Sequence, residues 1–157
     1  MRRFDLVLPQ SLDDCLKILA QRGDQAKLVA GGTDRLPQMK NGGTRPKVVV
    51  DVSAVAEMKG IKETADGIEI GALTTLTEIE KNPLVTKSYR LLADAASKVA
   101  SPQIRNTGTI GGNVSQDARC WYYRSGLPCY RAGGNTCFAD TPEGQNREHA
   151  IFDANRC

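Results

Sequence analysis

The order of apolar and polar positions in the first fifty residues predicts a small β-α-β unit. The run FDLVL (4–8) predicts a short strand, and KVVVDVS (47–53) predicts a buried one. Between them Ser11 is a candidate N-cap, followed by four apolar residues at the spacing of one helical face: Leu12, Cys15, Leu16 and Leu19. A further short strand begins at residue 26 and ends at the Gly31-Gly32 pair. On this pattern Cys15 is a buried core residue.

A hairpin and two helices are predicted after residue 53. The segment 61–72 alternates on both sides of Asp66-Gly67, which favours a β-hairpin. Helical spacing predicts one helix from Thr74 or Thr75 to Asn82-Pro83 and another over 88–100. We therefore expect an α+β fold with three parts: a βαβ-like unit over 1–53, an antiparallel sheet with helices over 54–119, and an irregular cysteine-rich segment over 120–157.

Composition excludes several classes of protein. The 157 residues are 40% hydrophobic and 25% charged, which is typical of a globular chain. The net charge of +3 comes from scattered basic residues, so we expect no nucleic-acid partner. The apolar stretch before Pro9 is too short for a signal peptide or a membrane span, and we expect a cytoplasmic protein with no membrane partner. In that reducing compartment clustered cysteines favour metal binding or catalysis over disulfides.

Two glycine-rich segments, VAGGTD (29–34) and NTGTIGGN (106–113), offer consecutive backbone N–H groups for an anion. Neither has the dinucleotide-binding spacing, and neither carries the lysine of a P-loop. A single Gly-Gly pair is usually a turn, whereas two such loops fit a diphosphate held between two subdomains. Spacing alone leaves both interpretations open.

The segments LVAGGTDRLPQMKNG (28–42) and SPQIRNTGTIGGNVS (101–115) resemble the flavin-binding subunit of the molybdenum hydroxylases. This family includes xanthine dehydrogenase, carbon monoxide dehydrogenase and aldehyde oxidoreductases. The resemblance implies an FAD-binding fold in which 1–53 and 54–119 are two subdomains, the second incomplete at its C-terminus, and both loops contact the FAD diphosphate. The implied contacts are Val29, Ala30, Gly31, Gly32, Thr33, Asp34, Arg35, Leu36, Gly108, Thr109, Gly112 and Asn113, with Ser115 and Asp117 as neighbours. Arg35 stands where the family pattern has an apolar residue.

The remaining cysteines have the spacing Cys120-x8-Cys129-x7-Cys137-x19-Cys157, which contains no C-x2-C step. Four thiolates with irregular spacing can still bind an iron–sulfur cluster if the loops between them fold back, and AGGN (132–135) supplies flexible backbone for this. The tail resembles the inserted loop that carries a [4Fe-4S] cluster in some members of the family, namely aldehyde oxidoreductase and 4-hydroxybenzoyl-CoA reductase. The resemblance implies all four cysteines as cluster ligands, with zinc or unligated thiols as alternatives. Trp121, Tyr122 and Tyr123 are expected to shield the cluster by packing, with electron relay as the other interpretation.

The resemblance implies an electron-transfer subunit that passes electrons between iron–sulfur centres and FAD to NAD or a redox protein. Its implied partners are a molybdenum cofactor-binding large subunit and a [2Fe-2S] small subunit. No side chain of this chain is expected to be catalytic, because the cofactors carry the redox chemistry. The alternatives are a truncated or split structural subunit without flavin, completed by a chain that supplies the C-terminal half, and a zinc-binding interaction module.

Overall fold

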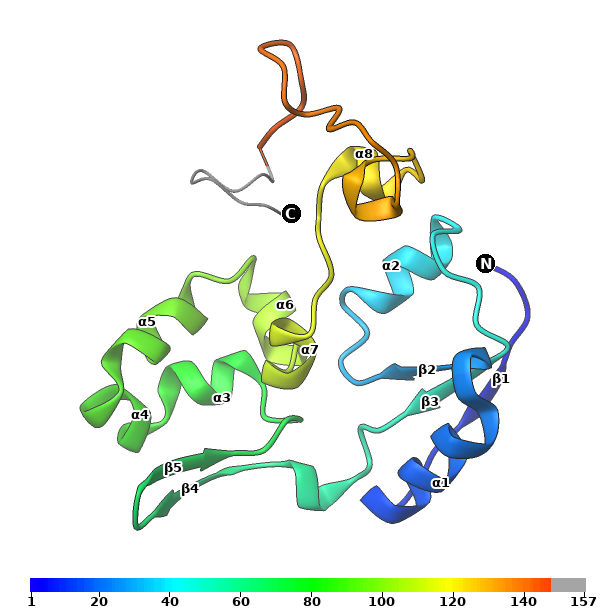
Figure 1. Cartoon of the computed structure of the whole chain (residues 1–157). Coiled ribbons are helices and arrows are strands. Elements are labelled where there is room, and N and C mark those ends of the chain that lie inside the picture. The colour runs from blue at the N-terminus through cyan, green and yellow to red at the C-terminus, as the bar shows by residue number, and fades with distance from the viewer. Residues whose placement is uncertain (148–157) are drawn as a thin grey trace. The chain divides into compact units, whose positions relative to one another are not determined.

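The computed structural model describes residues 1–147 and divides into two compact units (Figure 1). Unit 1 covers Met1–Ser115, and unit 2 begins at Gln116. Helices and strands both occur, so the predicted α+β class is confirmed. No helix within residues 1–147 is both long and apolar enough to cross a membrane.

The N-terminal part of unit 1 is a parallel three-stranded sheet with the strand order β1-β3-β2. Its elements along the chain are β1 (Asp5–Val7), α1 (Leu12–Arg22), β2 (Ala26–Val29), α2 (Arg35–Lys40) and β3 (Val48–Asp51). The Ser11 side chain caps α1 by accepting a hydrogen bond from the backbone N–H of Asp14 at 3.1 Å, as the sequence predicts. The β-α-β expectation for this part of the chain is therefore confirmed.

Both faces of this sheet are covered, which explains the unbroken apolar run of β3. On one face Val48 and Val50 pack with Cys15 of α1, which is 3% exposed. On the other face Val49 packs with Met39 of α2. A parallel strand buried on both faces carries apolar residues continuously rather than in alternation. This sheet places the end of β2, and the glycine loop that follows it, at its carboxyl edge.

The rest of unit 1 is an antiparallel hairpin covered by short helices (Figure 1). The elements are β4 (Ile61–Thr64), β5 (Gly67–Ile70), α3 (Leu76–Lys81), α4 (Pro83–Ser88), α5 (Arg90–Ser97), α6 (Pro102–Thr107) and α7 (Ile110–Val114). Their common core contains Ile79, Val85 and Ala96 from α3, α4 and α5, with Ile68 and Ile70 of the hairpin against it.

Two sequence predictions in this region need correction, and two of its helices lack a sequence prediction. Thr64 pairs with Gly67, so the hairpin turn is Ala65–Asp66 and Gly67 belongs to β5. The helix predicted over 88–100 is wrong at both ends, since α5 covers only Arg90–Ser97. The separate helices α4 and α6 were not predicted, although each begins with the same signal. Asn82 or Ser101 is the N-cap, and a proline is the first helical residue, where its missing N–H costs nothing.

The capping box of α3 makes stability depend on pH. The Thr75 hydroxyl and backbone N–H both donate to Glu78 Oε2 at 2.7 Å, and these bonds hold the pKa of the Glu78 carboxyl below its usual value. The carboxylate therefore stabilises the fold above the usual glutamate pKa of about 4.3, and this contribution is lost as the pH falls through the lowered pKa. Glu78→Gln should remove that part of the pH dependence, because a glutamine amide does not titrate. Denaturant midpoints of both chains across about pH 2 to 7 test this, and parallel curves would contradict it.

Candidate functional site

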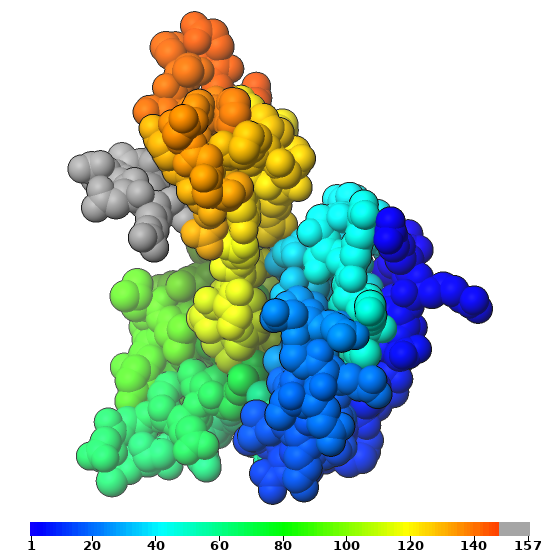
Figure 2. Space-filling model, turned by 45° about the vertical axis from the view of Figure 1, so that its right-hand side comes forward, coloured from blue at the N-terminus to red at the C-terminus, as the bar shows by residue number. Residues whose placement is uncertain are grey.

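The two glycine-rich loops meet inside unit 1. A Cβ atom on Gly31 would lie 1.9 Å from the carbonyl oxygen of Thr107, so no other residue fits there without separating the loops. A Cβ atom on Gly108 would lie 3.5 Å from the Thr33 hydroxyl oxygen, which brings a second pair of residues together. Figure 2 shows the segment around α7 beside the segment that follows β2. Segments that are about 75 residues apart in sequence thus form one site.

The first loop is placed by the parallel sheet. It follows β2 at the carboxyl edge, where ligands bind in open α/β sheets. Gly32 has φ +72, a left-handed conformation that strains other residues, and its carbonyl accepts a hydrogen bond from the backbone N–H of Leu36 at 3.1 Å as α2 begins. A tight turn at the end of β2 therefore directs the loop toward Thr107.

The second loop is held in place by backbone hydrogen bonds to the segment before α3. The backbone N–H groups of Ile110 and Gly111 donate to the carbonyl oxygens of Thr74 and Ala72, each at 2.9 Å. A Cβ atom on Gly111 would lie 2.8 Å from the Ala72 oxygen, so this glycine also permits a close backbone approach. Sequence reasoning missed this support, because only the folded chain brings 72–76 next to 108–111.

Helix α6 is tied to α3 by side chains as well. Arg105 Nε lies 3.1 Å from Glu80 Oε2, and both side chains are largely shielded from solvent. The Thr77 hydroxyl donates to Asn106 Oδ1 at 2.7 Å. These contacts fix the C-terminal end of α6, where Thr107 presents its carbonyl to Gly31.

The site offers unpaired backbone donors, mostly from the first loop. In the part of the chain that the structure describes, the N–H groups of Gly31, Gly32 and Thr33 have no hydrogen-bond acceptor, and in the second loop the same holds for Thr109. The other donors from 108–113 bond to the 72–76 segment, to Ile104 of α6 or to the N-cap residue Thr109. Consecutive free N–H groups form a cradle for an anion. The arrangement can therefore hold a phosphate or diphosphate without a charged side chain.

The predicted contact residues are distributed over three parts of the structure. Val29 ends β2 and Ala30 follows it, while Arg35 and Leu36 begin α2. Gly112 and Asn113 lie in α7 with Thr109 as its N-cap, and Ser115 follows this helix. Arg35 Nη1 donates to Gln38 Oε1 at 3.2 Å, and Gln38 Nε2 donates to Asp34 Oδ2 at 2.6 Å, so these polar side chains bond along α2. Asp117 belongs to unit 2.

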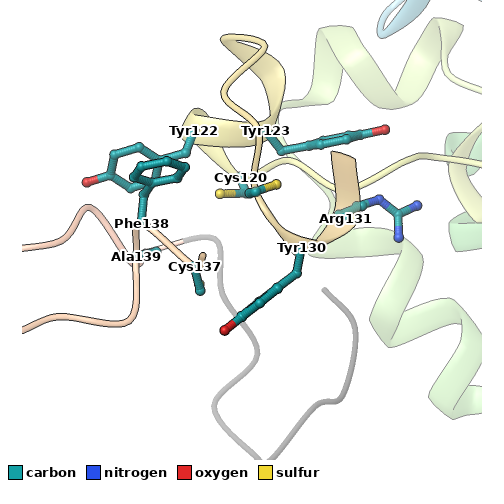
Figure 3. A pocket seen from close by; sticks show the side chains of 9 residues that line it. Cys120, Tyr122, Tyr123, Tyr130, Arg131, Cys137, Phe138 and Ala139 are labelled. Atoms are coloured by element: carbon teal, nitrogen blue, oxygen red, sulfur yellow. The ribbon is translucent and has the colours of Figure 1, made fainter. Parts of the chain in front are cut away.

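Unit 2 brings three of the predicted cysteine ligands around one pocket (Figure 3). Cys120 precedes α8 (Trp121–Arg124), Cys129 precedes a 3-10 turn (Tyr130–Ala132), and Cys137 lies beyond that turn. Cys120 and Cys129 are buried, whereas Cys137 is partly exposed. Aromatic residues complete the lining: Tyr122, Tyr123, Tyr130 and Phe138.

A tight glycine turn brings Cys137 back toward Cys129. A Cβ atom on Gly134 would lie 1.8 Å from the Pro128 carbonyl oxygen, and Gly133 has φ +87. The backbone N–H of Tyr130 donates to the Thr136 carbonyl at 3.1 Å, which pairs the two arms of the turn. The AGGN segment thus folds back as the sequence suggested.

The donor chemistry of the pocket fits a metal centre, although its present geometry does not form one. Within residues 1–147 no three His, Cys, Asp or Glu side chains are grouped closely enough to hold a metal ion. The fourth predicted ligand, Cys157, and the sole histidine, His149, lie outside the described residues. Three thiols from three turns are the kind of donor set that binds zinc or an iron–sulfur cluster.

Beside the pocket Asp117 forms a polar cluster that sequence reasoning missed. The Tyr123 hydroxyl donates to Asp117 Oδ2 at 2.7 Å, and Arg131 Nε donates to Oδ1 at 3.0 Å. These bonds, the tyrosine bond first, lower the pKa of the Asp117 carboxyl, and the same bond raises the pKa of Tyr123. In the sequence, Asp117 and Arg131 are only a pair of opposite charges 14 residues apart, and such a pair does not by itself predict a contact.

Comparison with known proteins identifies relatives over most of the chain. A family described as "FAD binding domain in molybdopterin dehydrogenase" matches residues 2–149. The carbon monoxide dehydrogenase medium chain of Hydrogenophaga pseudoflava is 39% identical over 113 residues, which are 72% of this chain and 39% of the relative. The solved carbon monoxide dehydrogenase of that organism superposes with a TM-score of 0.71 over the same shares of the two chains. Quinoline 2-oxidoreductase from Pseudomonas putida 86 has a TM-score of 0.71 at 30% identity, covering 74% of this chain and 41% of that one.

One relative extends further along the chain. The aldehyde oxidoreductase FAD-binding subunit PaoB of Escherichia coli is 37% identical over 134 residues, which are 84% of this chain and 42% of the relative. Because unit 1 ends at Ser115, a match of this length must include part of unit 2. The chain spans about two fifths of the length of these relatives.

Proposed function

Because the chain belongs to the family of FAD binding domains in molybdopterin dehydrogenases, we propose that it is the FAD-holding part of an electron-transfer subunit in a molybdenum hydroxylase complex. The observation that carries this proposal is the meeting of the two glycine loops, with Gly31 against the Thr107 carbonyl. The match over residues 2–149 supports FAD as the ligand of this site.

The loops fit the diphosphate of FAD. Gly31, Gly32 and Thr33 would donate their free N–H groups to its oxygens from one side, and Thr109 from the other. Bound FAD supplies electron-transfer chemistry, so the chain needs no acid or base of its own. The residues of this chain bind and orient: the parallel sheet fixes the first loop, and the 72–76 segment fixes the second.

We further propose that Cys120, Cys129, Cys137 and Cys157 bind a [4Fe-4S] cluster. The shared pocket of the first three supports this, as does the extension of the aldehyde oxidoreductase match into unit 2. Since metal binding and local folding are coupled, the cysteine loops would close further when the cluster binds.

The proposed partners are a molybdenum cofactor-binding large subunit, a [2Fe-2S] small subunit and NAD or a redox protein as acceptor. The relatives are named as a medium chain and an FAD-binding subunit, which supports assembly with other subunits. Since this chain spans about two fifths of those relatives, the remaining part would come from further sequence or from another chain.

Anaerobic purification of the 157-residue chain, followed by flavin and metal quantification, tests both cofactors. We expect bound FAD and about four irons per chain. A chain without flavin that still joins its partners would overturn the flavin proposal and favour the structural subunit. Zinc without iron would overturn the cluster proposal and favour the zinc-binding module.

The cysteines are expected to act as a set. Cys129→Ser should lower the bound iron to below about a tenth of the unmodified level, because a hydroxyl is a poor cluster ligand. Cys15→Ala is the matched control, since Cys15 lies in the core of unit 1 and should leave iron unchanged. Iron analysis and the visible absorption spectrum are the measurements. Normal iron in the Cys129→Ser chain would remove this cysteine from the proposed site.

A further inference from the structure

We propose that the adjacent residues Tyr122 and Tyr123 are positioning residues that hold the three cysteine-bearing turns together in the metal-free chain. Each tyrosine links α8, which follows Cys120, to a different cysteine turn. This inference deepens the proposed metal site and rests on it for its biological meaning. In this role the two tyrosines help to assemble the site, rather than only shielding a cluster or relaying electrons to it.

Tyr123 links Cys120 to the Cys129 turn through a shared carboxylate. Its hydroxyl donates to Asp117 Oδ2 at 2.7 Å, and Arg131 Nε donates to Asp117 Oδ1 at 3.0 Å. Arg131 belongs to the 3-10 turn directly after Cys129, and its guanidinium carbon lies 5.4 Å from the centre of the Tyr123 ring. Asp117 therefore joins the two turns through charge-assisted bonds, and the cation–π contact adds to them.

The stretch of chain before Cys120 is fixed by the same group of residues. Arg124, at the end of α8, donates from Nε to the Ala118 carbonyl oxygen at 2.9 Å. The backbone N–H of Ala118 in turn donates to Asp117 Oδ1 at 2.8 Å. The Cys120 backbone is thus held on both sides, from 117–118 before it and from α8 after it.

Tyr122 links Cys120 to the Cys137 turn. Its ring stacks on Phe138, the residue after Cys137, with ring centres 5.9 Å apart and planes inclined by 29°. Its hydroxyl accepts a hydrogen bond from the backbone N–H of Gln145 at 3.0 Å. In Figure 3, Tyr122 and Phe138 lie on one side of Cys120, and Tyr123 and Arg131 lie on the other. The two neighbouring tyrosines therefore act in opposite directions from one helix.

These contacts reduce the entropic cost of bringing the three cysteines together. Cys120, Cys129 and Cys137 are separated by eight and seven residues, so bringing their thiols together closes two loops at an entropic cost. Contacts that close the loops beforehand remove that cost from the binding step, which is the general effect of preorganisation. A metal or cluster precursor would then meet three cysteines that already line one pocket.

The test uses the full 157-residue chain, metal-free and reduced, with Tyr123→Phe and Tyr130→Phe. Tyr123→Phe keeps the ring over which Arg131 lies but loses the hydroxyl that bonds to Asp117. Tyr130→Phe is the matched control, since Tyr130 lines the same pocket, is 64% exposed, and makes no side-chain hydrogen bond within the described residues. The first probe is phenylarsine oxide, a trivalent arsenical that binds tightly only where two thiols are close. The second is anaerobic cluster assembly from ferrous and ferric iron with sulfide, measured by absorbance.

Loss of the Tyr123 bond should weaken arsenical binding and slow cluster assembly by about three- to tenfold, whereas Tyr130→Phe should match the unmodified chain. The circular dichroism and the denaturation midpoint of unit 1 should not change. Asp117→Asn is the second variant, since it weakens the same link without changing the pocket lining. Unaltered arsenical binding in both variants would overturn the positioning role.

The two readouts separate this inference from the metal proposal. Arsenical binding requires two nearby thiols but no iron, so it tests the positioning role independently of the cluster. If the unmodified chain takes up no iron while Tyr123→Phe still weakens arsenical binding, the cluster proposal fails and the positioning role stands. If iron is taken up equally fast by all variants and arsenical binding is equal, the positioning role fails and the cluster proposal stands.

Discussion

Gly31→Ala is expected to weaken flavin binding by about a hundredfold. The new Cβ would lie 1.9 Å from the Thr107 carbonyl oxygen, well inside contact distance, and this oxygen belongs to backbone that cannot rotate away. The loops must separate, and an overpacked contact of this kind costs about 3 kcal/mol, which corresponds to about a hundredfold in Kd. Titration of the chain with FAD, followed by quenching of flavin fluorescence, measures the change.

Gly43→Ala is the matched control for this substitution. A Cβ at position 43 would lie 3.6 Å from the Gln38 carbonyl oxygen, which is an ordinary contact, and Gly43 does not have a positive φ. We expect its flavin affinity to stay within about twofold of the unmodified chain. Equal affinities for Gly31→Ala and Gly43→Ala would show that the contact between the two loops is not required for flavin binding.

Gly134→Ala is expected to abolish iron binding without unfolding unit 1. Its Cβ would lie 1.8 Å from the Pro128 carbonyl oxygen, so the turn that returns Cys137 to the side of Cys129 could not close. The cost is again about 3 kcal/mol, which is large for a small irregular unit. Iron content and the visible spectrum report the cluster, and flavin affinity reports whether the glycine loops of unit 1 remain intact.

The neighbouring glycine gives the control. Gly133 has φ +87, and a Cβ atom added there would have no other atom within 4 Å, so Gly133→Asn meets no clash at that position. Asparagine also tolerates the left-handed region better than most residues. Iron content close to the unmodified level is expected for Gly133→Asn. A Gly134→Ala chain that also keeps its iron would mean that the Cys129–Cys137 turn does not bring the ligands together.

Several elements could be predicted from local sequence because their causes are local. The N-cap Ser11, the alternation of 61–72 and the apolar run of β3 each act within one element. Helices α4 and α6 also had a local signal, an N-cap followed by proline, which a search for apolar spacing overlooks in helices of six residues. The hairpin turn lies one residue earlier than the Asp66-Gly67 pair predicts. Thr64 pairs with Gly67, which leaves Ala65–Asp66 as the turn.

The sequence by itself determined the α+β class, the β-α-β unit and the two glycine motifs, since periodicity and glycine pairs are written in neighbouring residues. Only the tertiary structure decided that Gly31 meets Thr107 and that the 72–76 segment accepts hydrogen bonds from Ile110 and Gly111. The same holds for Asp117, which joins Tyr123 to Arg131. Each of these contacts joins separate elements or segments of the chain, and several involve backbone atoms that are common to all residues. Such contacts depend on how the elements pack, and residue type alone does not encode them.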